Sequence, residues 1–420
     1  MPELAEFLAP FRVHFHRSEG PQSLERYLTG LLTEHPNKNS DTIAQVVPGT
    51  SEQRLQGLLN DIDWDEDDLN RQRVERLLRL PTEGDAVLIF DDTGFAKQGR
   101  SSVGVARQYS GTLGKTGNCQ VTVNCHYAER NIAWPVATRL YLPEHWANDT
   151  ERRQKARVPE EITFQTKPQI ALGLLDRARA WGVRYACVTA DADYGDNPNF
   201  LDGLELRRQR YVAAVRADFT LAQSPRGGET HRATALIAAQ AKRAWRSVTW
   251  REGSRGWMRA RFVALRAWRV TSAGRRRAGW LIGEDASDGK RRYYWSNFGP
   301  DVALRRMVEY AHRRHWVEQY HEEAKGLLGW DQYQGRLWPG FHRHAVSVML
   351  AYSFLVWREW HDRPKYARPG RKRRAFSPRP DRRRSSLPAV HRGVSDWLRF
   401  EAVKERLLLE LMSVPERVPA

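Results

Sequence analysis

The chain has 420 residues, and its 68 Lys and Arg against 50 Asp and Glu give a net charge of +18 and a pI near 10.1. The length predicts two or three domains, and a 41% hydrophobic content can bury a large core. The positive charge favours a polyanionic partner, nucleic acid first and an anionic membrane surface second. No apolar run reaches the ~18 residues of a spanning helix, and no signal-peptide pattern opens the chain, so we expect a cytoplasmic protein.

The N-terminal residues 3–80 are expected to be helical, because apolar residues recur at helical spacing. Ser40 and either Thr50 or Ser51 are suited to cap two short helices, and a third helix is expected over 65–80. The short pair fits a helix-turn-helix that enters the major groove of DNA. It also fits an ordinary helical hairpin, which the acidic residues of the second helix favour.

An acidic pair follows the first strand of the chain. Residues 87–90 are apolar, and Asp91 and Asp92 come directly after them. The run predicts a strand that is buried on both faces and ends at the acids. A carboxylate fixed at a strand end is a good ligand for a hard divalent ion. A solvated strand-to-turn junction or a helix N-cap would use the same residues.

The next segment, 99–117, is rich in Gly and Ser and carries several cations. Lys97, Arg107 and Lys115 in this setting suit close approach to a phosphate backbone, although a surface hairpin loop has the same composition. Two alternating runs, 120–125 and 134–142, then predict an antiparallel meander that begins with the acidic strand.

A second acidic strand end repeats the pattern of the first. A helix over 168–181 leads into an apolar strand over 183–190, and Asp191 follows it directly. If the two acidic strands are neighbours, their carboxylates converge. We expect Asp193 and Asp196 to cap the following turn. The three cysteines fit neither a disulfide framework nor a zinc site and are expected to be reduced core residues.

The third acid is Glu318, within a helix expected over 301–328. Arg314 and Lys325 lie four residues before it and seven after it, about one and two helical turns, so the three share nearby faces. This pattern fits a salt-bridged surface or a metal ligand between two phosphate-binding cations. The histidines nearby form no zinc pattern with Glu318. The segment 363–386 is basic and Pro-rich, which predicts a disordered cationic arm.

Three motifs resemble one known family. DDTGFAKQGRSSVGVARQYSGTLGKTGNCQ, ADADYGDN and HRRHWVEQYHEEAKGLLGWDQYQGR closely resemble, in this order, the signature segments of insertion-sequence transposases of the DDE class. Arg314, Glu318 and Lys325 match the arginine, glutamate and lysine of the third motif. The motif's tyrosine falls on Ala311 here, with Tyr310 beside it. The resemblance runs from about residue 20 to 360.

The resemblance implies a metal-dependent DNA transposase. Its metal-binding and catalytic residues would be Asp191, Glu318 and either Asp91 or Asp92, with two Mg²⁺ or Mn²⁺ ions. Its partner would be double-stranded DNA, namely the terminal inverted repeats and the target, bound by a homodimer in a bacterial, nucleoid-associated protein. The expected DNA-binding residues are Arg314, Lys325, Lys97, Arg107, Lys115, Arg371, Lys372, Arg373 and Arg374.

The implied fold is α/β, an RNase H-like mixed sheet flanked by helices. Its expected parts are a helical, DNA-binding domain (1–82), a catalytic core in two segments (83–216 and 298–360), a β-rich insertion (217–297), and a basic arm with a terminal helix (361–420). Two other functions remain open. The chain fits an RNase H-like nuclease without strand transfer, or a non-catalytic DNA-binding protein derived from a transposase.

Overall fold

The computed structural model describes residues 2–112, 114–226, 228–253, 256–362 and 386–413. Within these residues the strands form a single twelve-stranded sheet. Its first half contains β1 (Val87–Ala96), β2 (Ala106–Ser110), β3 (Lys115–Ala128), β4 (Ala133–Leu140), β5 (Cys187–Ala190) and β6 (Tyr211–Val215). Its second half contains β7 (Thr220–Ala222), β8 (Thr230–Arg232), β9 (Arg246–Gly253), β10 (Gly256–Val270), β11 (Arg276–Asp285) and β12 (Arg291–Ser296).

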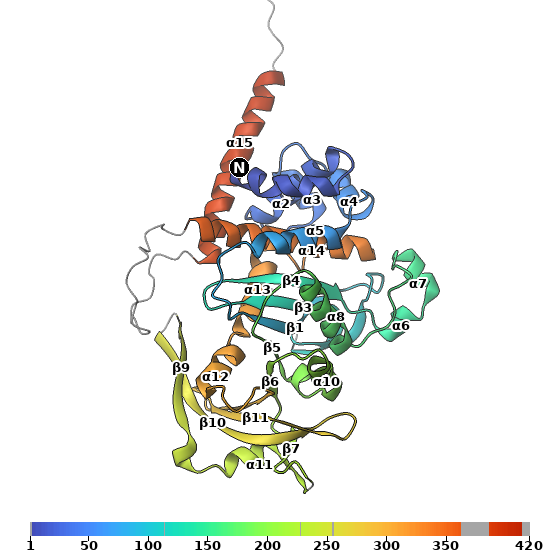
Figure 1. The fold of residues 1–420 in the computed structure, drawn as a ribbon. Helices are drawn as coiled ribbons and strands as arrows, with labels where there is room; N and C mark the ends of the chain where they lie inside the picture. Colours follow the sequence, from blue (N-terminus) through green and yellow to red (C-terminus); the bar gives the residue numbers. More distant parts are fainter. Residues whose placement is uncertain (1, 113, 227, 254–255, 363–385, 414–420) are drawn as a thin grey trace, which may run out of the picture.

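The first half of the sheet has the RNase H-like arrangement that the sequence predicts. β1 lies in its centre, with β3 and then β4 antiparallel on one side and β5 and then β6 parallel on the other. The predicted meander of the acidic strand with β3 and β4 is therefore confirmed. The α/β fold class, a large mixed sheet flanked by helices, is confirmed as well (Figure 1).

The acidic strand is longer than predicted. We expected it to end at residue 90, but β1 continues through both acids to Ala96, because β3 pairs with it at every position from Val87 onwards. Only the parallel partner ends early, since β5 pairs with β1 from Val87 to Phe90 and stops at Ala190. The acids therefore lie where β1 keeps one neighbour and loses the other, which opens that edge of the sheet.

The two acidic strands are neighbours, as the convergence of their carboxylates requires. Phe90 of β1 is paired with Ala190 of β5, so Asp91 and Asp191 both follow directly on a paired position. β5 has four residues, fewer than the predicted run over 183–190. α10 (Pro198–Leu206) and β6 follow β5 and complete a strand–helix–strand unit.

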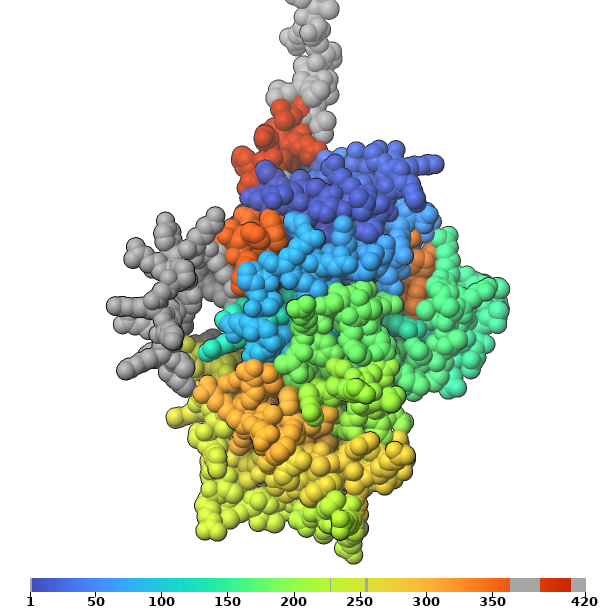
Figure 2. Space-filling model, in the orientation of Figure 1, coloured from blue at the N-terminus to red at the C-terminus, as the bar shows by residue number. Residues whose placement is uncertain are grey.

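The β-rich segment extends the core sheet. β12 pairs with β6, and β11, β10, β7 and β8 follow outwards, with β9 beside β10. The short helices α11 (Ala233–Ala238) and η2 (Lys242–Ala244) lie in this segment. Figure 2 shows it, in yellow-green, at the opposite end of the molecule from the N-terminal helices in blue.

The N-terminal residues are helical, as predicted. They form α1 (Pro2–Leu8), η1 (Ala9–His14), α2 (Glu19–Leu32), α3 (Ser40–Val46), α4 (Glu52–Asn60) and α5 (Glu66–Leu77). Asn39, one residue before the expected Ser40, caps α3, and Ser51 caps α4 as expected. Both short helices pack on α2, and their apolar residues Ile43, Leu55 and Leu58 are fully buried.

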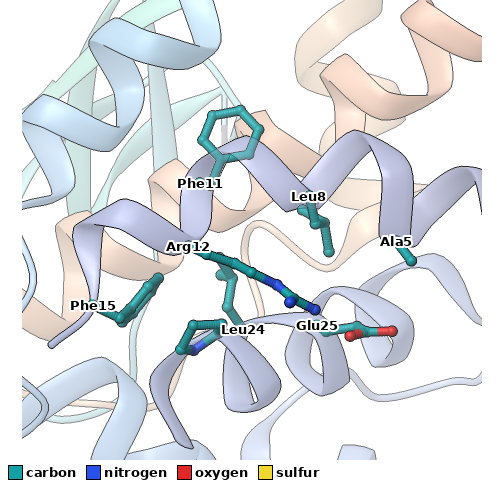
Figure 3. A pocket seen from close by; sticks show the side chains of 8 residues that line it. Ala5, Leu8, Phe11, Arg12, Phe15, Leu24 and Glu25 are labelled. Carbon is teal, nitrogen blue, oxygen red and sulfur yellow. The ribbon is translucent and has the colours of Figure 1, made fainter. Parts of the chain in front are cut away.

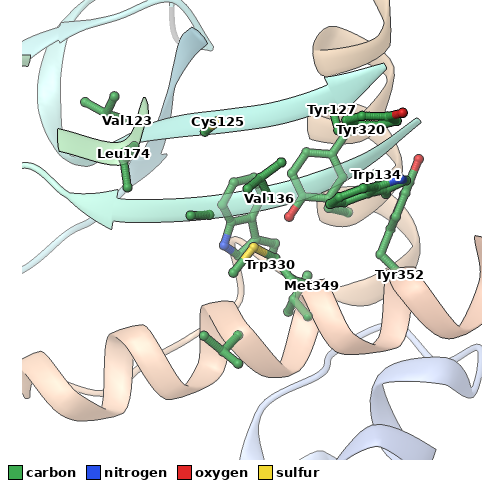
Figure 4. Close-up of a cluster of buried hydrophobic side chains, with 14 of the residues drawn as sticks. Val123, Cys125, Tyr127, Trp134, Val136, Leu174, Tyr320, Trp330, Met349 and Tyr352 are labelled. Carbon is green, nitrogen blue, oxygen red and sulfur yellow. The ribbon is translucent and has the colours of Figure 1, made fainter. Parts of the chain in front are cut away.

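A long buried helix, α14 (Trp338–His361), joins these helices to the sheet. It contacts α2, α4 and α5 on one side and β4 on the other, and α15 (Leu387–Ser413) packs beside it. Figure 4 shows the core between the strands and α14, where Tyr127 of β3 stacks on Trp134 of β4 with ring centroids 4.6 Å apart. The N-terminal helices and the sheet thus share one hydrophobic core.

The remaining helices surround the sheet. They are α6 (Glu144–Ala147), α7 (Thr150–Lys155), α8 (Lys167–Ala180), α9 (Ala192–Gly195), α12 (Leu304–His312) and α13 (His315–Leu328). The prediction of a single helix over 301–328 is wrong, because the helix is interrupted at Arg313 and Arg314, between α12 and α13. None of the described helices is both long enough and apolar enough to pass through a membrane.

Gly195, at the end of α9, provides a test of how tightly the second acidic segment is packed. A Cβ on this residue would lie 1.8 Å from the carbonyl oxygen of Ala214 in β6. We expect Gly195→Ala to lower the free energy of unfolding, measured by urea denaturation, by about 1–3 kcal/mol, because the backbone must move. Gly173→Ala in α8 is the control. Its Cβ would meet nothing within 4 Å, so stability should rise by up to about 1 kcal/mol. Equal effects of both variants would contradict this packing.

Candidate active site

Asp91 is a buried acid on the face of β1 that α13 covers. Side chains alternate along a strand, so Asp91 shares its face with Ile89, which packs in one buried cluster with Val317 of α13. The carboxyl oxygen Oδ2 of Asp91 accepts a hydrogen bond from Nη1 of Arg314 at 3.1 Å. Its Oδ1 accepts one from the backbone N–H of Asp92 at 2.9 Å. Asp91 is only 8% exposed.

Asp92 points to the opposite face of β1. There its carboxylate forms a 2.7 Å ion pair with Lys167 at the start of α8 and accepts a hydrogen bond from the hydroxyl of Tyr194 in α9. The two adjacent acids therefore have different partners. Asp91 faces the arginine of the third motif, and Asp92 ties β1 to α8 and α9.

Asp191 lies directly after β5 and caps α9. Its Oδ1 accepts hydrogen bonds from the backbone N–H groups of Asp193 at 3.0 Å and Tyr194 at 3.3 Å. We expected Asp193 and Asp196 to cap this turn, and that is wrong. Both instead pair with Arg216, at 3.1 Å for Asp196. Asp191 takes the cap because it immediately precedes the helix in an extended conformation.

Glu318 lies one turn into α13, which begins directly after Arg314. Its carboxylate pairs with Nη2 of Arg314, while Nη1 of the same guanidinium binds Asp91. The acid of the sheet and the acid of the helix are thus joined through a single arginine. The Glu318 side chain is 55% exposed.

Burial makes the charged forms of Asp91 and Asp191 costly. It raises the pKa of Asp91 to about 8, an effect that Arg314 opposes and the nearby Asp191 reinforces. Burial likewise raises the pKa of Asp191 to about 6, with Asp193 adding to the shift. Loss of water is the larger cause of both shifts, and repulsion from the neighbouring acids adds to it, while Arg314 lowers both pKa values.

The donor set fits a hard divalent cation, because its acids are carboxylates and a positive charge would relieve their repulsion. Among the described residues, however, no three His, Cys, Asp or Glu side chains lie close enough together to hold one ion. The cation at this place is the Arg314 guanidinium. The three cysteines are buried and free, as expected.

Two predicted DNA-binding lysines are engaged within the protein. The Nζ of Lys325 donates to Oγ1 of Thr93 at 2.7 Å, to the carbonyl oxygen of Gly94 at 2.9 Å and to Oγ1 of Thr112 at 3.0 Å. The Nζ of Lys97 donates to the carbonyl oxygen of Tyr333 at 2.5 Å. Both cations therefore fix the segment after the acids of β1.

The other predicted cations are found elsewhere. Arg107 on β2 and Lys115 on β3 are exposed. Arg371, Lys372, Arg373 and Arg374 lie outside the described residues. Tyr310, beside the position of the motif's tyrosine, stacks on Phe298 and accepts a hydrogen bond from Arg306, so it packs away from the acids.

Three residues around the acids were not found from the sequence. Thr93 and Tyr194 lay inside the matching motifs but had no assigned role. Lys167, the first residue of α8, lies 75 residues after its partner Asp92 in the sequence. The contacts of Tyr194 follow from its place in the short helix that Asp191 caps, whereas no local pattern marks Lys167.

A separate pocket between the first helices does not compete with this site. Figure 3 shows it between η1 and α2, where Phe11, Arg12, Leu24 and Glu25 line it. Its volume is about 10 Å³, which is room for a single water at most.

Lys325 allows its structural role to be separated from DNA binding. We expect Lys325→Met to lower the free energy of unfolding without DNA by about 1–3 kcal/mol, because it leaves the oxygens of Thr93 and Gly94 without their donor. Lys115→Met, at an exposed position, should change it by less than about 0.5 kcal/mol. Urea denaturation measures both. If Lys325→Met left the free energy of unfolding unchanged, the contacts of Lys325 with Thr93 and Gly94 would not stabilise the fold.

Comparison with known proteins gives the family. The profile described as "DDE superfamily endonuclease" matches residues 10–257. A curated relative from Microchaete diplosiphon, "Probable transposase for insertion sequence element IS701", is 27% identical over 322 residues, which are 75% of this chain and 77% of the relative. A solved structure, the piggyBac transposase synaptic complex with hairpin DNA, aligns over 100% of this chain and 83% of that one, with a TM-score of 0.45 and 10% identity. The profile match spans more than half of the chain, so this protein belongs to the DDE endonuclease superfamily, and the resemblance to insertion-sequence transposases of the DDE class is confirmed.

Proposed function

We propose that this protein is a transposase that binds the ends of an insertion sequence and catalyses DNA strand cleavage and strand transfer. The observation that supports this most is the joining of Asp91 and Glu318 through Arg314, beside Asp191. These residues come from β1, the end of β5 and α13, so acids more than two hundred residues apart share one place. The relative from the IS701 element, a probable transposase, supports the same reaction.

Asp91, Asp191 and Glu318 are the proposed catalytic acids and metal ligands. Between the two first-strand candidates we choose Asp91, because it shares a face with Arg314 and Thr93, whereas Asp92 is paired with Lys167 on the other face. Two Mg²⁺ or Mn²⁺ ions held there would activate a water or 3′-hydroxyl oxygen and stabilise the leaving oxygen. Arg314 would then be released from the acids to contact a DNA phosphate near the scissile bond.

The proposed partner is double-stranded DNA, both the terminal repeats and the target. The net charge of +18 supports a strong sequence-independent attraction. Exposed Arg107 and Lys115, and the arginine-rich run 371–374, are proposed to contribute to it. A homodimer on DNA would supply one active site for each end of the element.

The proposed acids predict a defined pattern of activity in variants. Asp91→Asn, Asp191→Asn and Glu318→Gln should each reduce cleavage of a labelled terminal-repeat duplex by at least about a thousandfold, because an amide cannot supply the anionic oxygen. Double variants should be no worse, since residues that act as one unit are strongly non-additive. Binding to the duplex should persist. Joined products in the same assay separate strand transfer from hydrolysis alone.

Two neighbouring acids are the matched controls. Glu322→Gln, on the exposed face of α13, should cleave at the normal rate. Asp92→Asn should retain activity, with some loss of stability because Lys167 and Tyr194 lose their partner. If Asp92→Asn abolished cleavage while Asp91→Asn did not, the first ligand would be Asp92. Full activity of all three acid variants would end the proposal.

Metal dependence is the next expectation. Cleavage should require Mg²⁺ or Mn²⁺ and stop in a chelator, because the proposed ligands are all carboxylates. Calcium should support DNA binding with little cleavage. The measurement is the cleavage rate after exhaustive chelation and after each ion is restored. A rate unaffected by chelation would contradict a metal-assisted mechanism.

A further inference from the structure

A cationic surface, separate from the acid site, lies past the end of β1. A groove of about 460 Å³ is formed there by the segment after β1, by β2 and β3 and by the region of α6 and α7. Three arginines line it, Arg100, Arg107 and Arg152, together with Gln98, Asn118 and His145. No carboxylate lines it. We call this surface the arginine groove.

The charge of the arginine groove is not neutralised within the described chain. Its three guanidinium groups form no ion pair with any described carboxylate. By contrast, Arg177 of α8 pairs with Asp67, and Arg207, directly after α10, pairs with Asp176, each at 2.6 Å. Arg152 instead lies 3.7 Å over the ring of Trp146. Three cations that line one groove and pair with no described carboxylate favour an external anion.

The frame of the groove is fixed by hydrogen bonds. The side-chain amide of Asn118 donates to the carbonyl oxygens of Lys97 at 2.7 Å and Gly99 at 2.9 Å, which holds the turn after β1. Arg152 donates to the carbonyl oxygen of Arg100 at 3.1 Å and so joins α7 to that turn. These contacts fix the backbone at Arg100 and the guanidinium of Arg152, and the pairing of β2 with β3 places the backbone of Arg107 beside Asn118.

The groove begins two residues after the end of the strand that carries Asp91. Seven residues separate Asp91 from Gln98, which is at most about 23 Å at 3.3 Å per residue. This distance corresponds to roughly seven base pairs of duplex at 3.4 Å each. The stretch between the two sites is the one that Lys325 fixes through Thr93 and Gly94. A duplex whose reacting phosphate lies at Asp91 can therefore reach the groove with its flanking part.

We propose that the arginine groove binds the phosphate backbone of duplex DNA up to about seven base pairs from the reacting phosphate. This inference rests on the proposed function, since it extends the DNA path from the acid site. Guanidinium groups suit phosphates through paired hydrogen bonds. Contacts of this kind position the duplex without reading its sequence.

The salt dependence of binding tests the groove. The full chain is titrated against a fluorescein-labelled duplex of about 40 base pairs and arbitrary sequence, with chelator present to prevent cleavage. The triple variant Arg100→Gln, Arg107→Gln and Arg152→Gln should lower the slope of log affinity against log salt by roughly 2 to 3, at about 0.9 per lost phosphate contact. Replacing the same residues by Lys should restore most of the slope.

A matched variant controls for net charge. Arg226, Arg243 and Arg275 are exposed, pair with no described carboxylate and lie in the β-rich segment at the far end of the molecule. Their triple change to Gln removes the same charge and should alter the slope by less than about 1. Equal slopes for the two triple variants would overturn the groove as a DNA contact. Thermal unfolding verifies that both variants are folded.

Two further outcomes are decisive. A slope loss seen with duplex RNA but not with duplex DNA would assign the groove to another polyanion and overturn the proposal. The proposed function fails by a different result, normal cleavage by all three of Asp91→Asn, Asp191→Asn and Glu318→Gln, which these binding measurements do not involve. An unchanged DNA slope alongside inactive acid variants would therefore reject the groove alone.

Discussion

The Arg314 guanidinium is the interaction on which the candidate site depends. It binds Asp91 with one nitrogen and Glu318 with another, so it joins the central strand to α13. A buried carboxylate is costly without a partner, and the raised pKa of Asp91 shows how incompletely this one is compensated. The break between α12 and α13 places Arg314 just before the second helix. Glu318 then follows one turn later, where its side chain stays 55% exposed and is joined to Asp91 through that guanidinium.

The other end of α13 is held independently, which gives the helix a defined position. Lys325 binds the segment of β1 after the acids, and the buried Glu323 accepts a 2.8 Å hydrogen bond from Tyr352 of α14. Because α14 also packs against the N-terminal helices, those helices support the glutamate through a continuous core. The N-terminal layer therefore contributes to the site without supplying any of its acids.

The sequence predicted the parts of this arrangement that depend on local pattern. The N-terminal helices and the two acidic strand ends followed from apolar periodicity, and the RNase H-like core was implied by the resemblance of three motifs to the DDE transposases. That the two acidic strands are neighbours was only a condition until Phe90 was found paired with Ala190. The sequence missed what depends on distant partners. β1 passes through its acids because β3 pairs with it, and neither strand alone encodes that length. Asp91 and Asp92 became distinguishable only when Lys167 and Arg314 were placed on opposite faces.

The arginines of this basic chain likewise differ in whether they have a carboxylate partner within the protein. Some stabilise the fold, as Arg269 does by pairing in the core with Asp202 at 2.5 Å and Glu205 at 2.9 Å. Such residues add to the formal charge but offer little to a partner, because their field is already neutralised nearby. The formal net charge of the sequence therefore overstates the charge that the protein offers to a partner. The proposed DNA-binding surface is marked instead by guanidinium groups that pair with no described carboxylate, and Arg100, Arg107 and Arg152 form such a group after the strand that carries Asp91.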